Sequence, residues 1–251
     1  MKTLLSSVVI LFLISCFSSC RDKLEIQSIS GQNIEINDSI SDHTEINDFI
    51  EPYKSSIEDE MNRPLSYTFE AMYKSDTPYN TAIGNMMADA VFELANPVFY
   101  GRTNDSIDGV LLNYGGIRAG IDKGVITTET AYNIMPFENM VVVAKLKGIE
   151  INEMFKSISE SKRAQPISNL KISVDKDWNL IEYTIGNKKV EASQYYYIAT
   201  SDYVLGNLDF FQKADTVYQT DYKLRNLFID YFKRHDTIKA KADNRFQKNE
   251  L

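Results

Sequence analysis

The sequence predicts an α+β domain in which mixed sheets are covered by helices. Apolar residues at three- and four-residue spacing mark several amphipathic helices, and short runs of β-branched residues mark strands. The two kinds of segment follow one another without the strict alternation that a doubly wound sheet requires. Hydrophobic residues make up 43% of the chain and charged residues 25%, which is ordinary for a globular protein. The roughly 200 residues after the N-terminal segment are enough for one large domain.

Residues 1–19 are predicted to form an export signal. A basic start is followed by an apolar stretch from Leu4 to Phe17, and the charged residues from Arg21 onward end it. The stretch is short for a membrane-spanning helix, which needs roughly 20 apolar residues. Cys16 and Cys20, the two cysteines of the chain, each follow a serine, as at the cleavage site of bacterial lipoproteins.

We favour Cys20 as the acylated residue because the polar chain begins there, and Cys16 is the alternative. The protein is then exported and lipid-anchored to a bacterial membrane, on the periplasmic or the cell-surface side. A plain signal peptide or an uncleaved anchor are the other interpretations of this segment. The mature domain would contain no cysteine, which excludes disulfides and thiolate metal sites there.

Residues 20–44 are polar and predict a tether, and residues 45–64 predict an amphipathic linker helix. Pro52 lies near the start of this helix, and Pro64 ends it. The helix could dock a partner or pack on its own domain. Its apolar face consists of Ile46, Phe49, Ile50, Tyr53, Ile57 and Met61.

Residues 65–251 are predicted to form the folded domain. A helix should begin with Asn80 or Thr81 as its cap and stop at Pro97. The other predicted elements, in chain order, are a strand at Gly109–Leu112, a strand at Asn139–Lys147, a helix around Ile151–Ile158, a hairpin of Leu170–Val174 with Leu180–Ile185, a strand at Tyr195–Thr200 and a helix from Leu224 to Phe232.

The net charge of −8 argues against nucleic acid or an anionic membrane face as the main partner, because phosphate backbones require clustered Lys and Arg. A small anion held by one arginine remains compatible with it. The chain has two histidines, His43 in the tether and His235 after the last helix. Two isolated histidines cannot build a two-metal centre, so we predict that both are exposed to solvent.

One segment after a predicted strand could bind a ligand. Two glycines, Gly115 and Gly116, allow a sharp turn and a close approach of the backbone. Asn113 offers an amide that can donate and accept, and Arg118 offers a planar fork suited to phosphate or carboxylate. The alternative is an ordinary strand-to-turn glycine pair with a surface arginine.

Two further segments could display aromatic rings. Phe137 follows Pro136 just before a predicted strand, although a core position is the commoner fate of phenylalanine. Tyr203 follows another strand, and Asp209 lies beyond it as a possible acceptor for sugar hydroxyls. Two aromatic rings flanking a slot would hold a flat base by stacking, at about 1–3 kcal/mol per face.

Together these segments resemble the C-terminal, substrate-binding domain of the 5′-nucleotidase and UDP-sugar hydrolase family. The motifs in their order are Asn113 to Arg118, Pro136-Phe137, and Tyr203 with Asp209, preceded by a helix resembling the family's Gly-Asn-x-x-x-Asp-Ala pattern at Gly84 to Ala90. The resemblance spans about residues 65 to 247. It implies that Asn113 and Arg118 contact a nucleotide and that Phe137 and Tyr203 clamp its base.

The sequence departs from the family in two places. Thr77 stands where an arginine is usual, seven residues before Gly84, and the turn from Asn207 to Phe210 is bulkier than the family's Gly-Gly-Asp-Gly. Both changes argue for weak or reshaped nucleotide binding.

The resemblance implies no catalytic, metal-binding or cofactor-binding residue in this chain. The family's metal-bearing domain has no counterpart here, so we expect divalent metals only in a separate metallophosphatase partner. The favoured hypothesis is the nucleotide- or nucleoside-recognising half of a split 5′-nucleotidase. The alternatives are a non-catalytic nucleotide-binding lipoprotein and a degenerate scaffold at the cell surface.

Overall fold

The computed structural model describes residues 26, 28–37 and 39–249. The predicted export signal and both candidate acylated cysteines lie outside the described residues. The chain divides into two compact units, residues 1–49 and 50–251. Within the described part of the chain, no helix is both long and apolar enough to cross a membrane.

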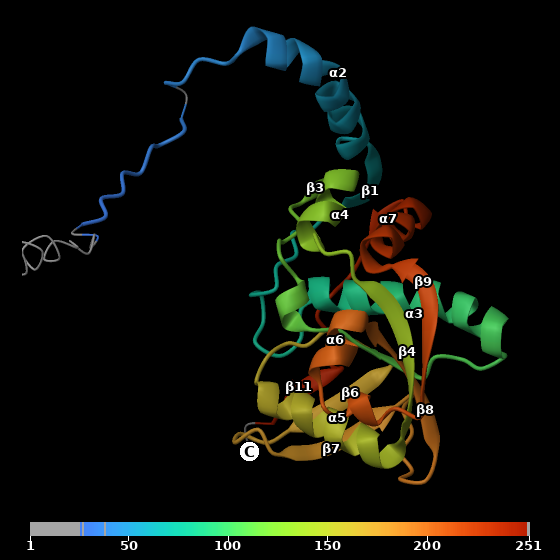
Figure 1. The fold of residues 1–251 in the computed structure, drawn as a ribbon. Coiled ribbons are helices and arrows are strands. Elements are labelled where there is room, and N and C mark those ends of the chain that lie inside the picture. Colours follow the sequence, from blue (N-terminus) through green and yellow to red (C-terminus); the bar gives the residue numbers. More distant parts are fainter. Residues whose placement is uncertain (1–25, 27, 38, 250–251) are drawn as a thin grey trace, which may run out of the picture. The chain divides into compact units, whose positions relative to one another are not determined.

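A helix, α2 (Thr44–Met61), is present where the linker was predicted; it contains Pro52 and includes the boundary between the units. It ends before Pro64, the first residue of β1 (Pro64–Thr68). In the described part of the chain, the other helices are α3 (Ala82–Thr103), α4 (Thr128–Ile134), α5 (Gly148–Ser161), α6 (Asp202–Asn207) and α7 (Leu224–Arg234), with 3₁₀ turns η1 (Tyr114–Gly116) and η2 (Phe211–Lys213) (Figure 1).

The main sheet has five strands in the order β5-β2-β8-β4-β9. Its strands are β5 (Ile167–Ser168), β2 (Gly109–Leu111), β8 (Tyr195–Ser201), β4 (Met140–Lys147) and β9 (Thr216–Lys223). The β2–β8 pair is parallel, and the other pairs are antiparallel. The mixed α+β architecture predicted from the sequence is therefore confirmed.

Both faces of the main sheet are covered. Along β4, Val141 and Val143 pack in a core with α3 and α7, whereas Ala144 and Leu146 pack in a second core with α5. This alternation is the two-residue period of a strand with both faces buried. In Figure 1, α3 lies alongside β4 and β9, and α5 lies next to β7.

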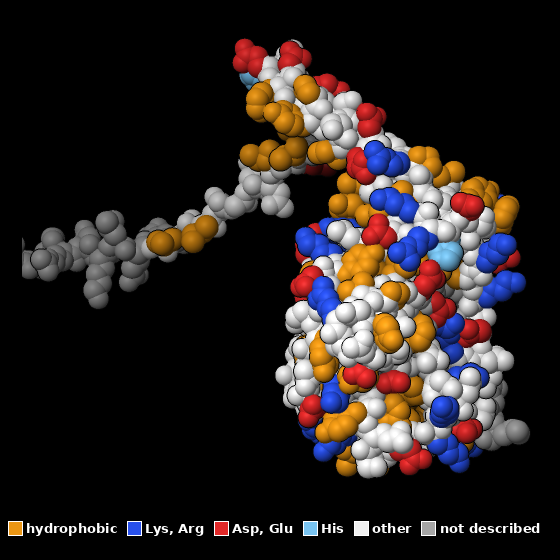
Figure 2. Space-filling model, turned by 90° about the vertical axis from the view of Figure 1, so that its right-hand side faces the viewer, with side chains coloured by type: hydrophobic (Ala, Val, Ile, Leu, Met, Phe, Trp, Pro, Cys, Tyr) orange, Lys and Arg blue, Asp and Glu red, His pale blue; other side chains and the backbone are white. Residues whose placement is uncertain are grey.

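Two small sheets complete the domain. One has the order β10-β1-β3, with β10 at Thr237–Ile238 and β3 at Gly124–Thr127; the other has the order β11-β6-β7, with β11 at Phe246–Lys248, β6 at Leu170–Val174 and β7 at Leu180–Ile185. The β6–β7 pair is the predicted hairpin. On the face shown in Figure 2, basic and acidic side chains of the described residues are interspersed.

The prediction that Pro97 ends the first helix of the domain is wrong. Thr81 caps the start of α3 as predicted, since its side chain accepts a hydrogen bond from the Gly84 N–H at 3.2 Å. The helix then continues through Pro97 to a left-handed cap at Asn104. A proline removes one helical hydrogen bond. Packing of α3 against the main core, with Phe99 fully buried beyond the proline, offsets this loss.

A half-buried arginine ties the C-terminal strand to α3. Arg245, next to β11, donates to both oxygens of Asp89 at 2.8 and 3.0 Å and to the Ile167 carbonyl at 2.7 Å. It also pairs with Asp243. Burial raises the pKa of the Asp243 carboxyl, but the hydrogen bonds and the charge of Arg245 outweigh burial, so this pKa is lowered overall. The charges compensate one another. Removing the carboxylates would leave the largely buried Arg245 guanidinium without a counterion, whereas Asp89 and Asp243 keep contact with solvent.

We expect Arg245→Met to lower the free energy of unfolding by about 1–3 kcal/mol, less than for a fully buried pair because Asp89 is partly exposed. Arg63→Met removes an arginine whose ion pair with Glu60 is exposed on both sides, so it should cost no more than about 0.5 kcal/mol. Urea unfolding of the purified chain followed by circular dichroism measures both values. Equal costs for the two variants would contradict this role of Arg245.

Candidate functional site

Four segments converge at one edge of the main sheet. Because β4 and β8 are antiparallel with Val141 opposite Ser201, the start of β4 lies beside the end of β8. The end of β2 joins them through parallel pairing with β8, and the end of β9 joins them where Lys223 pairs with Met140. The turn after β2, the loop before β4 and the first turns of α6 and α7 therefore meet, although they are far apart in the sequence.

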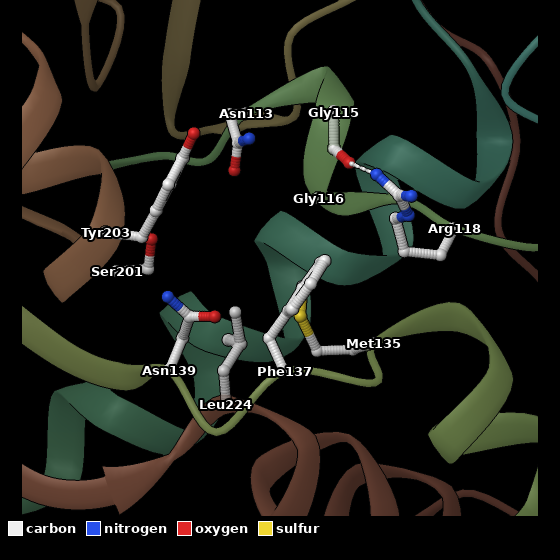
Figure 3. Close-up of a pocket in the computed structure, with 10 residues that line it drawn as sticks. All are labelled: Asn113, Gly115, Gly116, Arg118, Met135, Phe137, Asn139, Ser201, Tyr203 and Leu224. Carbon is white, nitrogen blue, oxygen red and sulfur yellow. Dashed lines mark hydrogen bonds between the residues drawn. The ribbon is translucent and has the colours of Figure 1, made fainter. Parts of the chain in front are cut away.

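A pocket of about 330 Å³ lies among these loops. This volume is at the lower end of the range for small-molecule sites, and the lining combines apolar surface with a few polar groups, as such sites do. The lining residues are Asn113, Gly115, Gly116, Arg118, Met135, Phe137, Asn139, Ser201, Tyr203 and Leu224 (Figure 3).

The turn after β2 holds the Asn113 amide against two glycines. A Cβ at Gly116 would lie 2.9 Å from Asn113 Oδ1 and 3.4 Å from the Met135 methyl carbon. A Cβ at Gly115 would lie 3.4 Å from Asn113 Nδ2, which is an ordinary contact. The close approach at Gly116 therefore fixes where the amide can lie. In Figure 3 this amide lies at the upper boundary of the pocket.

Arg118 stacks on one of the displayed rings. Its guanidinium carbon lies 5.5 Å from the centre of the Phe137 ring, a cation–π distance. Its Nη1 donates to the Gly115 carbonyl at 3.4 Å. Figure 3 shows Phe137 between Tyr203 and Arg118. The guanidinium is exposed, so its remaining donors can reach a ligand at the rim.

The loop that carries Phe137 is held by the start of α7. Arg225, which is 7% exposed, donates to the Pro136 carbonyl at 3.1 Å and pairs with Glu138, so it grips the residues on both sides of Phe137. The backbone N–H of Leu224 donates to the Asn139 carbonyl at 2.8 Å. These contacts leave the Phe137 ring 41% exposed toward the pocket instead of in the core.

Ion pairs at Glu138 also hold the loop that carries Phe137. Hydrogen bonds from Lys223 and Arg225 lower the pKa of the Glu138 carboxyl. The Arg225 guanidinium also lies 4.1 Å from the centre of the Tyr132 ring. Within the described residues its buried Nε has no hydrogen-bond partner.

Tyr203 lies in the first turn of α6, which Ser201 caps by accepting a hydrogen bond from the Val204 N–H at 3.1 Å. The Tyr203 ring is 56% exposed. Asp202 connects Tyr203 to the segment that carries Phe137: Asp202 Oδ1 accepts hydrogen bonds from Asn139 Nδ2 at 3.0 Å and from the Tyr203 N–H at 2.7 Å. We call this contact between Asn139 and Asp202 the cross-brace.

The structure brings all the sequence-predicted site residues to the pocket except Asp209. Asp209 lies exposed in the turn between α6 and η2, outside the pocket lining. The Thr77 hydroxyl, at the position of the usual arginine, donates to the Asn80 carbonyl. Four further residues line the pocket that were not predicted from the sequence, namely Met135, Asn139, Ser201 and Leu224. Asn139 begins a predicted strand and Ser201 directly follows another, which is the signal that could have found these two residues.

In the described part of the chain, no three His, Cys, Asp or Glu side chains are close enough to hold a metal ion. His235 Nε2 lies 3.1 Å from a carboxylate oxygen of Glu93. These two residues are not in the pocket lining.

The fold is that of an α+β domain with a pocket at one edge of its main sheet. Residues 62–216 match the family described as the 5′-nucleotidase C-terminal domain, and the chain belongs to this family. The predicted resemblance is thereby confirmed.

Known relatives are longer than this chain. It is 24% identical to a 5′-nucleotidase of Vibrio parahaemolyticus over 83% of the chain and 37% of that protein. It is 35% identical to the trifunctional nucleotide phosphoesterase protein YfkN of Bacillus subtilis over 45% of the chain and 8% of that protein. The 5′-nucleotidase precursor of Thermus thermophilus has the same fold, with a TM-score of 0.67 and 19% identity over 83% of the chain and 44% of that structure. The chain thus spans less than half the length of these relatives.

Gly116→Ala should displace the Asn113 amide, whereas Gly115→Ala should leave it in place. The added methyl at Gly116 meets the end of a flexible side chain, so we expect a stability cost of about 1 kcal/mol or less, because the amide can rotate away. The side-chain amide resonances of Asn113 in a ¹⁵N-correlated NMR spectrum should shift in Gly116→Ala and stay within normal scatter in Gly115→Ala. Equal spectra for the two variants would contradict the proposed positioning.

Proposed function

We propose that this chain is the nucleotide- or nucleoside-recognising half of a split 5′-nucleotidase and acts with a separate metallophosphatase chain in nucleotide catabolism. The observation that carries the proposal is the convergence of Asn113, Arg118, Phe137 and Tyr203 on one pocket. An amide, a guanidinium and two displayed aromatic rings are the groups that recognise a base and a phosphate.

The proposed binding mode follows from the lining. The base would lie between the Phe137 and Tyr203 rings, its edge would meet the Asn113 amide, and Arg118 at the rim would pair with phosphate. Figure 3 is compatible with this mode, because the two rings lie on different sides of the space below Asn113. With Thr77 in place of an arginine, we expect an affinity on the order of micromolar or weaker.

Phosphate-ester cleavage is assigned to a separate chain because the histidines here are His43 and His235, and neither belongs to a cluster of metal ligands in the described residues. The export signal and the acylation of Cys20, or of Cys16, belong to the same proposal. They would place the recognition domain on a membrane, where exported nucleotides can reach it.

Thr77 favours a second candidate, a non-catalytic nucleotide-binding or scaffold lipoprotein. Its hydroxyl is used within the loop, so the charge that the family places there is not supplied at this position. A neighbouring reading frame encoding an exported metallophosphatase would favour the split enzyme over this alternative.

Phe137→Ala and Tyr203→Ala should each weaken adenosine binding by roughly fivefold to a hundredfold, since each removes one stacking face. Tyr100→Ala serves as the control, because this tyrosine is 53% exposed on α3 and does not line the pocket. Isothermal titration calorimetry measures all three variants. Unchanged adenosine affinity in both pocket variants would exclude the base clamp.

The purified chain alone should release no phosphate from AMP, with or without added divalent metal. Addition of a separate metallophosphatase chain should give phosphate release that a chelator abolishes and that Phe137→Ala reduces. A malachite green assay of released phosphate provides the measurement. Chelator-sensitive hydrolysis by this chain alone would refute the assignment of hydrolysis to a second chain.

A further inference from the structure

Three basic side chains from separate segments gather at the turn after β2. Lys74, from the loop before α3, donates to the Ile117 carbonyl at 3.0 Å and lies 4.9 Å from the centre of the Tyr114 ring. Arg163, which follows α5, lies 5.5 Å from the centre of the same ring. Arg118 is the third and donates to the carbonyl of Gly115 in this turn.

None of these three cations forms an ion pair among the residues that the structure describes, although the chain carries a net charge of −8. Two acids of adjoining segments are engaged elsewhere: Asp76 accepts from the Tyr73 N–H, and Asp122 accepts from the Tyr73 hydroxyl. Like charges at one turn repel one another, and contact with a tyrosine ring offsets only part of this cost. An anion bound at this turn would reduce the repulsion.

The position of the turn indicates which anion fits. Asn113 and Gly115 line the pocket, whereas Tyr114 between them does not. The two cations at Tyr114 thus lie next to the pocket lining, beside the turn, and Arg163 is exposed. A ligand whose flat group enters the pocket would carry an attached anionic group outward to this position. The Tyr114 N–H donates to Gln165 Oε1 at 2.7 Å, which fixes the Arg163 segment against the turn.

We propose that Lys74 and Arg163, on the Tyr114 ring, form with Arg118 an anion subsite that receives the phosphate of a nucleotide bound in the pocket. This inference rests on the proposed function and adds two recognition residues outside the sequence motifs. It also supplies positive charge that the threonine at position 77 does not. A phosphate held outside the pocket remains accessible to a second chain that cleaves it.

Calorimetry of the full chain with adenosine and AMP tests the subsite. The double variant Lys74→Gln/Arg163→Gln should weaken AMP binding roughly tenfold or more and change adenosine binding less than about twofold, because adenosine carries no phosphate. Each single variant should lose roughly threefold for AMP. Lys74→Arg keeps the charge and should retain most of the AMP affinity.

A matched control removes two exposed charges from another part of the chain. Arg234→Gln/Lys239→Gln lowers the net charge equally, so AMP affinity should change less than about twofold. Inorganic phosphate should compete with AMP in the wild type and not with adenosine.

The outcomes separate the two proposals. If the double variant keeps the full wild-type preference for AMP over adenosine, the subsite is wrong and the proposed function stands. If both ligands weaken equally in the single and double variants, the two residues merely support the turn, and the subsite is again wrong. If neither ligand binds the wild type, the proposed nucleotide recognition itself fails. Should the double variant not fold, the single variants and Lys74→Arg provide the same comparison.

Discussion

The register of β4 against β8 places Val141 opposite Ser201, and the pocket depends on this pairing. A slip of one residue would exchange the two faces of β4, which pack against different helices. It would also move Phe137 and Tyr203 out of alignment. On the other side of β4, the Thr220 hydroxyl donates to the Val141 carbonyl at 2.6 Å where the β9 register shifts. A bulge of this kind pins a strand and redirects its end, and here it delivers the start of α7 to the pocket.

The start of α7 links core packing to the site. Leu224 and Phe228 belong to the core with α3, while Arg225 from the same turn holds the loop before β4. A buried arginine is costly unless its donors are satisfied. Glu138, the Pro136 carbonyl and the Tyr132 ring together meet most of this requirement. Exposure of the Phe137 ring is thus supported by a polar contact network behind it.

The turns that line the pocket carry a more direct sequence signal than some of the elements around them. The glycine pair and Pro136-Phe137 signal backbone geometry directly, so Asn113 and Phe137 could be placed without the fold. Strand β9 was missed because it is an exposed edge strand without a continuous apolar run. The prediction that a helix ends at Pro97 was wrong because tertiary packing overrode the local preference of proline. The role of Arg225 depends on a contact across 89 positions, which no local pattern reveals.

The cross-brace between Asn139 and Asp202 joins the segment that carries Phe137 to the segment that carries Tyr203, independently of any ligand. The conformational entropy of ordering these two segments is then lost during folding and not during binding. In the nucleotide site proposed above, such a slot would favour a flat guest over a puckered ring or an aliphatic chain. Association would then require no ordering of these two segments, so diffusion into the slot would limit its rate.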